Sequence, residues 1–241
     1  MKALKTIFAY LLIISFLSCG KPFERQKLSK NDLETIENIQ TEIKENPNDD
    51  TNFQILGVFY LKKNYINKAI LNLEKCIKIN PENHEARAWL GSAFAKKGRE
   101  ADGFLSLGKK KIYYVKKGYD YINKAKINAP NNPVIRIIRI QVICAIKNRF
   151  SFGKIKEVID DLKFLKKISI EDETFPLELK GQFYLAYAIY YNTLSEMGLK
   201  ADIDQGIYYS KMAFAILPSK IDKEKALKLN QSFINLKEKK Q

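Results

Sequence analysis

Apolar side chains recur every three or four residues through most of this chain, which is the spacing of an amphipathic α-helix. The clearest short example lies between Ser29 and Pro47, and its apolar residues are Leu33, Ile36, Ile39 and Ile43. Serine is a common helix-starting residue, and proline ends helices. The pattern predicts a helix over residues 29–46, and its continuation toward the C-terminus predicts an all-α protein.

A longer repeat is superimposed on this helical spacing. Asn-Pro pairs, which favour turns, end at Pro47 and Pro81, 34 residues apart. The segment between them has large, small and helix-ending residues in the positions of a tetratricopeptide repeat (TPR), namely Phe53, Leu56, Gly57, Tyr60, Ala69, Leu73 and Pro81. It therefore resembles a TPR, a helix-turn-helix unit. Gly57 and Ala69 would let the two helices approach closely, and Leu73 would fill the seam between them.

The remaining chain resembles further, less regular units. A second unit begins at Asn83 with a turn at 96–99, and about 15 residues beyond the 34-residue period precede Pro130. Their apolar spacing predicts one elongated helix near 101–128. Helices are also expected over 134–146 and 155–168 (joined at 148–153), over 176–197 and 202–217, and over 221–240 as a cap.

These expectations combine into one fold class. We expect an all-α, TPR-like α-solenoid of about four helix-turn-helix units over residues 29–241, closed by N- and C-terminal capping helices.

The N-terminus carries a different pattern. Lys2 and Lys5 precede an apolar run over residues 7–17, about 11 residues long, whereas roughly 20 are needed to cross a bilayer. A basic start and a short apolar stretch predict a secretory signal peptide over residues 1–18. The alternative is a buried first helix.

Ser18-Cys19 resembles the lipobox of bacterial lipoproteins, although Phe16 and Leu17 depart from its usual residues. The resemblance implies that the leader is removed and that lipid is attached to Cys19. Several acyl chains on one cysteine would hold the protein on a membrane. Residues 19–28 would form a tether, and the protein would lie in the bacterial cell envelope.

Charge adds a preference for partners. The chain has 42 Lys and Arg against 27 Asp and Glu, a net charge of +15, which favours anionic partners. The alternative is that the lysines are spread over solvated helix faces. Cys76 and Cys144 lie singly inside apolar helical patterns, which indicates buried thiols rather than a disulfide.

The candidate chemical motifs are incomplete. Gly103 to Lys110 has the spacing of a phosphate-binding loop, but a lysine replaces the serine or threonine that holds magnesium. Residues 202–206 lack the glutamate of a calcium loop, so a helix start is expected there. His84 is the only histidine, which excludes a multi-histidine metal site. We therefore expect no enzymatic activity, no cofactor and no metal.

Residues 109–117 combine five lysines with two tyrosines: Lys109, Lys110, Lys111, Tyr113, Tyr114, Lys116 and Lys117. Such a run could bind nucleic acid through phosphates and stacked bases. Export disfavours nucleic acid, so an anionic membrane surface is the better ligand, and a solvated helix face is the remaining alternative.

The TPR resemblance implies that partner proteins bind the inward-facing positions of the first helices of the units. These positions are Gln54, Val58, Leu61, Lys62, Ala88, Ser92, Lys96, Phe183, Tyr187, Tyr190 and Tyr191. Because Gln54 and Val58 stand where a carboxylate clamp has lysine and asparagine, the clamp is not supported. The tyrosines of the fourth unit would form an aromatic groove for an apolar or extended peptide, or would pack against the capping helix.

The function that these patterns favour is a lipid-anchored TPR scaffold that binds another envelope protein or peptide without catalysis. One alternative is an accessory carrier of a small apolar ligand or lipid, or a transporter-associated component. The other is an intracellular, basic nucleic-acid-binding module.

Overall fold

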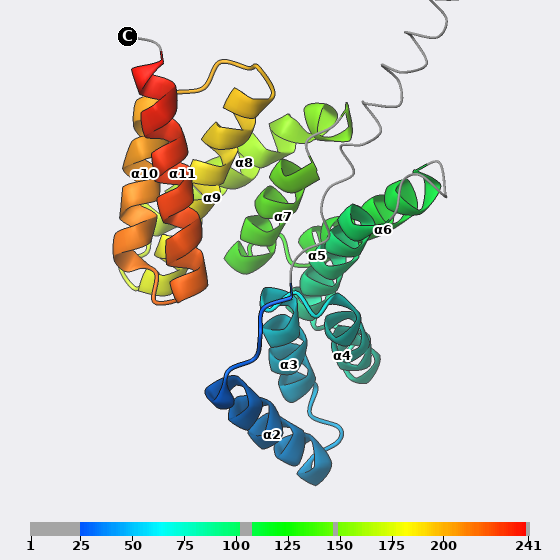
Figure 1. The fold of residues 1–241 in the computed structure, drawn as a ribbon. Helices are drawn as coiled ribbons and strands as arrows, with labels where there is room; N and C mark the ends of the chain where they lie inside the picture. Colours follow the sequence, from blue (N-terminus) through cyan, green and yellow to red (C-terminus); the bar gives the residue numbers. More distant parts are fainter. Residues whose placement is uncertain (1–24, 102–107, 147–148, 240–241) are drawn as a thin grey trace, which may run out of the picture. The chain divides into compact units, whose positions relative to one another are not determined.

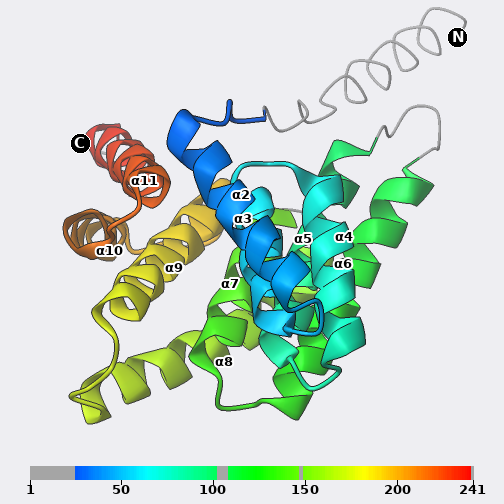
Figure 2. The ribbon, with the colours of Figure 1, turned by 90° about the horizontal axis from the view of Figure 1, so that it is seen from below.

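A computed structural model describes residues 25–101, 108–146 and 149–239 of the chain. These residues form helices α2 to α11 and no strand (Figures 1 and 2). The expected signal peptide over 1–18, Cys19 and most of the tether lie outside these ranges. Across the described helices, none is long and apolar enough to cross a membrane.

The chain divides into two compact units, residues 1–121 and 122–241. The helices of the first unit are α2 (Lys30–Glu45), α3 (Asp50–Lys62), α4 (Ile66–Ile79), α5 (His84–Glu100) and the first part of α6 (Lys109–Asn128). Those of the second are the rest of α6, α7 (Pro133–Ile146), α8 (Arg149–Glu171), α9 (Leu177–Glu196), α10 (Ile203–Ile216) and α11 (Lys220–Glu238).

The first unit has the helix starts that its sequence predicts. The Ser29 hydroxyl accepts a hydrogen bond from the backbone N–H of Asp32, whose carboxylate accepts one from the Ser29 N–H, so α2 begins with a capping box. Asp49 and Asn83 cap α3 and α5 in the same way with their side-chain oxygens. Local residue choice therefore fixes where these helices begin.

Close packing of α3 and α4 confirms the TPR interpretation of residues 53–81. A Cβ atom on Gly57 would lie 2.6 Å from Cγ of Leu73, so glycine is needed for this approach. Ala69 and Leu73 are fully buried in the same core.

The turn between the first two repeats is held by a polar cluster around Asp50. The Asp50 carboxylate accepts hydrogen bonds from the side-chain amides of Asn80 at 3.2 Å and Asn83 at 2.6 Å, and the Cys76 Sγ lies 3.7 Å from it. The Asn83 amide also donates to Oε1 of Gln54 at 2.7 Å. Cys76 is therefore a buried thiol packed within the fold, as the sequence indicates.

The second repeat differs in detail from its prediction. Residues 96–99 continue α5 instead of forming a turn, and the helix expected near 101–128 begins at Lys109. The glycine of the expected turn serves helix packing, since a Cβ atom on Gly98 would lie 3.0 Å from the backbone N of Val115 in α6. The extra residues of this repeat thus lengthen both of its helices.

In the second unit, α7 to α11 follow the predicted third repeat, fourth repeat and cap. The connection expected at 148–153 is wrong, because α8 already begins at Arg149. Gly153 is exposed, and one exposed glycine costs only about 1 kcal/mol in a helix, too little to end it. The cap α11 buries Phe233 completely, against Gly206 of α10.

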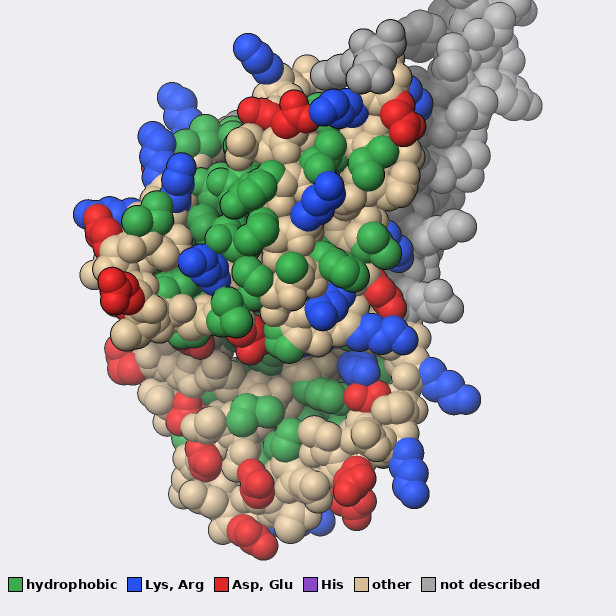
Figure 3. Space-filling model, turned by 90° about the vertical axis from the view of Figure 1, so that its left-hand side faces the viewer, with side chains coloured by type: hydrophobic (Ala, Val, Ile, Leu, Met, Phe, Trp, Pro, Cys, Tyr) green, Lys and Arg blue, Asp and Glu red, His purple; other side chains and the backbone are tan. Residues whose placement is uncertain are grey.

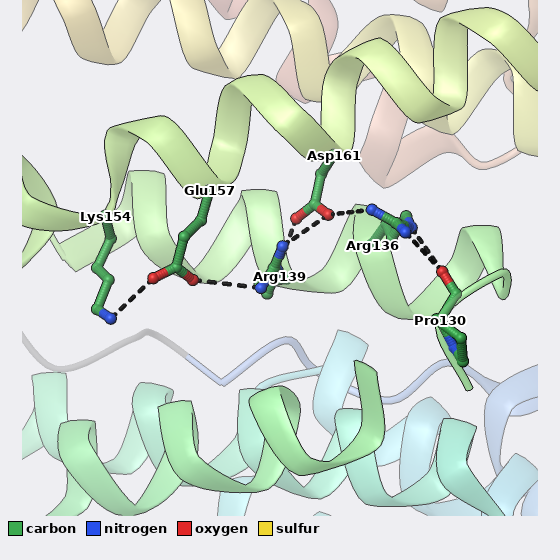
Figure 4. A network of polar contacts seen from close by, with 6 residues as sticks. All are labelled: Pro130, Arg136, Arg139, Lys154, Glu157 and Asp161. Atoms are coloured by element: carbon green, nitrogen blue, oxygen red, sulfur yellow. Dashed lines mark hydrogen bonds and ion pairs between the residues drawn. The ribbon is translucent and has the colours of Figure 1, made fainter. Parts of the chain in front are cut away.

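A charge network joins α7 to α8 (Figure 4). The fully buried carboxylate of Asp161 accepts hydrogen bonds from Arg139 Nε at 2.6 Å and Nη2 at 2.8 Å, and from Arg136 Nη1 at 2.8 Å. Arg139 also donates to Glu157 at 3.2 Å, and Arg136 donates to the Pro130 carbonyl oxygen. Arg136 further lies 3.9 Å from the centre of the Phe164 ring. The sequence analysis did not identify this network.

Candidate functional site

Four tyrosines of the fourth repeat form a stacked group, which we call the tyrosine cluster: Tyr184, Tyr187, Tyr191 and Tyr209. The first three are spaced three and four residues apart on α9, which places them on one stripe of that helix. Tyr209 comes from the middle of α10.

Tyr209 holds the group together. Its ring stacks on Tyr187 with a centroid distance of 4.3 Å and an interplanar angle of 11°. Its centroid lies 6.2 Å from that of Tyr191 and 5.8 Å from that of Tyr184. Offset aromatic stacking of this kind is worth about 0.5–1.5 kcal/mol per pair beyond area burial.

Every ring of the tyrosine cluster is half-buried and keeps part of its surface exposed. Burial, and next to it the neighbouring tyrosines, raises the pKa of Tyr187 above its ordinary value. Burial also raises the pKa of Tyr191, with a further contribution from Asp202. The phenols therefore stay neutral at physiological pH and can both donate and accept hydrogen bonds.

The tyrosine cluster also carries four hydroxyl groups. Within the described chain, the structure records ring contacts for these four tyrosines but no hydrogen bond to their hydroxyl oxygens. The surface thus combines flat apolar rings with polar groups that a bound segment could satisfy.

Tyr187 and Tyr191 both stack on Tyr209 of α10. The helix α9 that carries them also contacts the capping helix α11, through hydrogen bonds of Gln182 to Asp222 and of Ser232 to Asn192. Tyr190 is half-buried beside Tyr191, with 5.4 Å between ring centres, and Phe183 is only 2% exposed. Phe183 therefore supports the cluster from the core.

Most candidate residues of the first two repeats are buried in their own unit or hydrogen-bonded within it. Leu61 is 2% exposed and Ala88 is fully buried, so neither offers side-chain surface. The Lys96 ammonium donates to the Leu61 carbonyl oxygen and to Asn64 Oδ1, both at 3.1 Å, where α3 ends.

The other four first-half candidates differ in exposure. Gln54 accepts the Asn83 hydrogen bond, Val58 packs against the core, Ser92 is half-buried and Lys62 is exposed. Among the candidates, the structure therefore brings a group of aromatic side chains together only in the fourth repeat.

Two members of the tyrosine cluster were missed by the sequence analysis. Tyr184 lies three residues before Tyr187 and could have been found from helical spacing alone. Tyr209 could not, because its partnership with Tyr187 depends on how α10 packs on α9.

A separate pocket of about 500 Å³ lies where α8 turns into α9. Its wall is mainly apolar, with Ile168, Phe175 and Leu179, and its rim carries Glu171 and Asp172. The Asp172 carboxylate accepts hydrogen bonds from the backbone N–H and the hydroxyl of Thr174, at 2.9 and 2.6 Å. Nothing in the sequence analysis identified this pocket.

The described residues contain no group of three or more His, Cys, Asp or Glu side chains arranged to hold a metal ion. His84, the first residue of α5, lies 2.7 Å from Arg87 Nη1 and 3.3 Å from Glu82. Asp202 caps α10, which confirms the helix start expected there. Most of the segment from Gly103 to Lys110, whose sequence has the spacing of a phosphate-binding loop, lies outside the described residues. Its last residue, Lys110, belongs to α6.

Comparison with solved structures finds a thermophilic TPR protein from Thermus thermophilus, with a TM-score of 0.57 and 18% sequence identity. The match covers 83% of this chain and 87% of that protein. No protein-family model matches the sequence. No curated protein matches it either. At this level of identity the likeness establishes architecture, and together with the paired helices described above it shows that this protein has the fold of a TPR α-solenoid.

Proposed function

We propose that the protein is a non-catalytic scaffold that binds a segment of another protein on the tyrosine cluster of its fourth repeat. TPR solenoids generally mediate protein–protein interactions through the exposed faces of their repeats. The observation that carries the proposal is the half-exposed group of Tyr184, Tyr187, Tyr191 and Tyr209, whose hydroxyl groups make no hydrogen bond within the described residues.

Tyrosine suits this role for a physical reason. It offers a large, flat contact area and loses little conformational entropy when a partner binds. Here the rings are already fixed by stacking, since Tyr187 and Tyr209 lie 4.3 Å apart and nearly parallel. A preformed surface of this kind fits an extended or helical segment that presents apolar side chains and a few polar groups.

Photocrosslinking in living cells tests the site. A photoreactive phenylalanine analogue in place of Tyr191 should give a discrete crosslinked product, because that position lies within the cluster. The matched control is the same analogue in place of Leu71 on α4, which is 60% exposed but belongs to the first repeat. Equal product from both positions, or product from Leu71 alone, would place the binding site elsewhere.

We also propose that lipid on Cys19 attaches the protein to a membrane of the bacterial cell envelope, where the partner is another envelope protein. The support is the pattern of residues 1–19, with its basic start, short apolar run and Ser18-Cys19 pair. Several acyl chains on one residue give stable attachment.

The attachment is tested by fractionating cells that produce the wild-type chain or Cys19→Ser. The variant should accumulate with its leader uncleaved and should incorporate no labelled palmitate. Unchanged processing and lipid labelling would rule out the anchor without affecting the tyrosine cluster.

The pocket at the α8–α9 turn favours a second candidate, a carrier of a small ligand. A volume of about 500 Å³ lies within the range of small-molecule sites, and the lining is mainly apolar with a few polar side chains. Native mass spectrometry of gently purified protein should show a recurrent small adduct that Leu179→Trp, which fills the pocket, removes. Absence of any adduct would leave protein binding as the function.

A further inference from the structure

The first half of α6 concentrates positive charge. Five lysines, Lys109, Lys110, Lys111, Lys116 and Lys117, lie within nine residues, and no acidic residue occurs before Asp120. Lys109, Lys110, Lys111 and Lys116 are all exposed. Among the described ion pairs, none involves these four lysines.

These charges do not serve the helix that carries them. The N-terminal end of a helix is the positive end of its dipole and favours acidic residues. The first turn of α6 carries lysines and no acidic residue, so these charges gain no stabilisation from the helix dipole.

The same side of α6 presents apolar surface. Ile112 is 67% exposed and Tyr113 is 59% exposed, and the helical spacing places both beside Lys109 and Lys116. Val115, on the opposite side, is buried where α6 packs on Gly98 of α5. The face therefore combines two exposed apolar side chains with a surround of positive charge.

We propose that this face of α6, which we call the lysine face (Lys109, Ile112, Tyr113 and Lys116, with Lys110 at its edge), binds the surface of an anionic membrane. The exposed Lys111 adds charge at the same end of the helix, on the side of Val115. The lysines would lie among lipid phosphates, Tyr113 at the level of the head groups, and Ile112 at the boundary of the acyl chains. The isoleucine favours a membrane over nucleic acid, because a phosphate backbone gives an aliphatic side chain nothing to enter. This binding is independent of lipid on Cys19 and of the tyrosine cluster.

Vesicle binding tests the proposal with the full chain carrying Cys19→Ser, so that attached lipid cannot contribute. The measured quantity is the ratio of partition coefficients for vesicles of phosphatidylcholine with about 30 mol % phosphatidylglycerol and for phosphatidylcholine alone. The apolar N-terminal residues contribute to binding of both kinds of vesicle, so their contribution cancels in this ratio. Replacing Lys109, Lys110, Lys111 and Lys116 by Gln should lower it at least about fiftyfold, since each lysine near an anionic surface contributes about fivefold.

The matched control removes the same number of charges from exposed lysines elsewhere in the first unit: Lys27, Lys30, Lys44 and Lys78. Its ratio should fall by no more than about threefold, because long-range attraction is screened beyond about 10 Å. Equal losses in the two variants would overturn the proposal, since they would show that net charge alone attracts the protein.

Insertion of the apolar side chain has its own readout. Ile112→Trp should add blue-shifted emission on anionic vesicles, and lipids with a nitroxide near the glycerol should quench it. Emission that stays at the wavelength of exposed tryptophan would overturn the proposal. So would a four-lysine variant that loses binding to a single-stranded oligonucleotide while keeping its vesicle ratio, an outcome that would assign the face to nucleic acid.

Discussion

At the scale of single residues, Asp161 is the fully buried acid at the centre of the charge network of the second unit. Its carboxylate is fully buried and accepts hydrogen bonds from both Arg136 and Arg139. Removing one partner of a buried ion pair leaves the others buried without compensation. Asp161→Asn should therefore lower the free energy of unfolding by about 3–5 kcal/mol, measured by chemical denaturation.

The neighbouring Asp160 supplies the control, because it occupies the same helix but is exposed. Asp160→Asn should change the free energy of unfolding by no more than about 0.5 kcal/mol. Similar losses of unfolding free energy in both variants would show that the network stabilises the protein no more than one exposed negative charge does.

The tyrosine cluster should make stability depend on pH in the alkaline range. Burial raises the folded-state pKa of Tyr187 above the ordinary 10.0, and that of Tyr209 in the same direction. A raised folded-state pKa contributes stability that is complete below pH 10 and is lost as the pH rises toward the folded-state value. The unfolding free energy should therefore fall between about pH 10 and 11, together with delayed tyrosinate absorbance.

Tyr187→Phe removes one of these groups while keeping the ring. Its unfolding free energy should fall less steeply over the same pH range than that of the wild type. Identical slopes would mean that Tyr187 titrates alike in the folded and unfolded chain.

Cys76 should be chemically inert in the folded protein. It is fully buried, and burial, with the nearby Asp50 carboxylate, raises the pKa of its thiol to about 12. Because the thiolate is the reactive form, a maleimide at about pH 8 should label Cys76 only after denaturation. Rapid labelling without denaturant, located by peptide mass spectrometry, would contradict the packing of the first repeat.

At the scale of helices, two glycines make a matched comparison. Gly57→Ala would force a Cβ atom against Leu73 and should destabilise the protein by about 1–3 kcal/mol. Gly153→Ala places its Cβ atom in open space on α8 and should stabilise by about 0.5–1 kcal/mol. Thermal unfolding of the two variants measures both effects, and equal signs would refute this account of α3 and α4.

Most helices could be predicted from the sequence because their signals are local. Ser29, Asp202 and the Asn-Pro turns act within one helical turn, so the bounds of α2 and α10 and the end of α4 were predicted nearly correctly. The exceptions were residues 96–99 and 148–153, where glycine suggested connections. Gly98 is explained only by the close approach of α6, which sequence spacing does not show.

The candidate site could be predicted only in part for the same reason. Tyr187 and Tyr191 share a helix face and were identified from α9 alone. Their ring partner Tyr209, the pairing of Asp161 with Arg139 and the pocket beside Phe175 all depend on contacts between different helices.

At the scale of the whole molecule, hydrophobic surface remains uncovered on the terminal repeat. Figure 3 views the side that α10 occupies in Figure 1 and shows hydrophobic side chains gathered there. Tyr208 and Phe214 of α10 and Leu227 of α11 are exposed at 50%, 44% and 55%. The fold thus closes its core with α11 and still presents exposed apolar side chains on α10 and α11.

The central claim is that the tyrosine cluster binds a partner segment, and the affinity of the segment recovered by crosslinking tests it most directly. Titration calorimetry with that segment as a synthetic peptide should show binding to the wild type that Tyr187→Ala weakens at least about thirtyfold, as expected for a buried aromatic contact. Ile55→Ala, at an exposed position on α3, should leave the affinity unchanged. Equal affinity of the wild type and Tyr187→Ala for the peptide would contradict the claim.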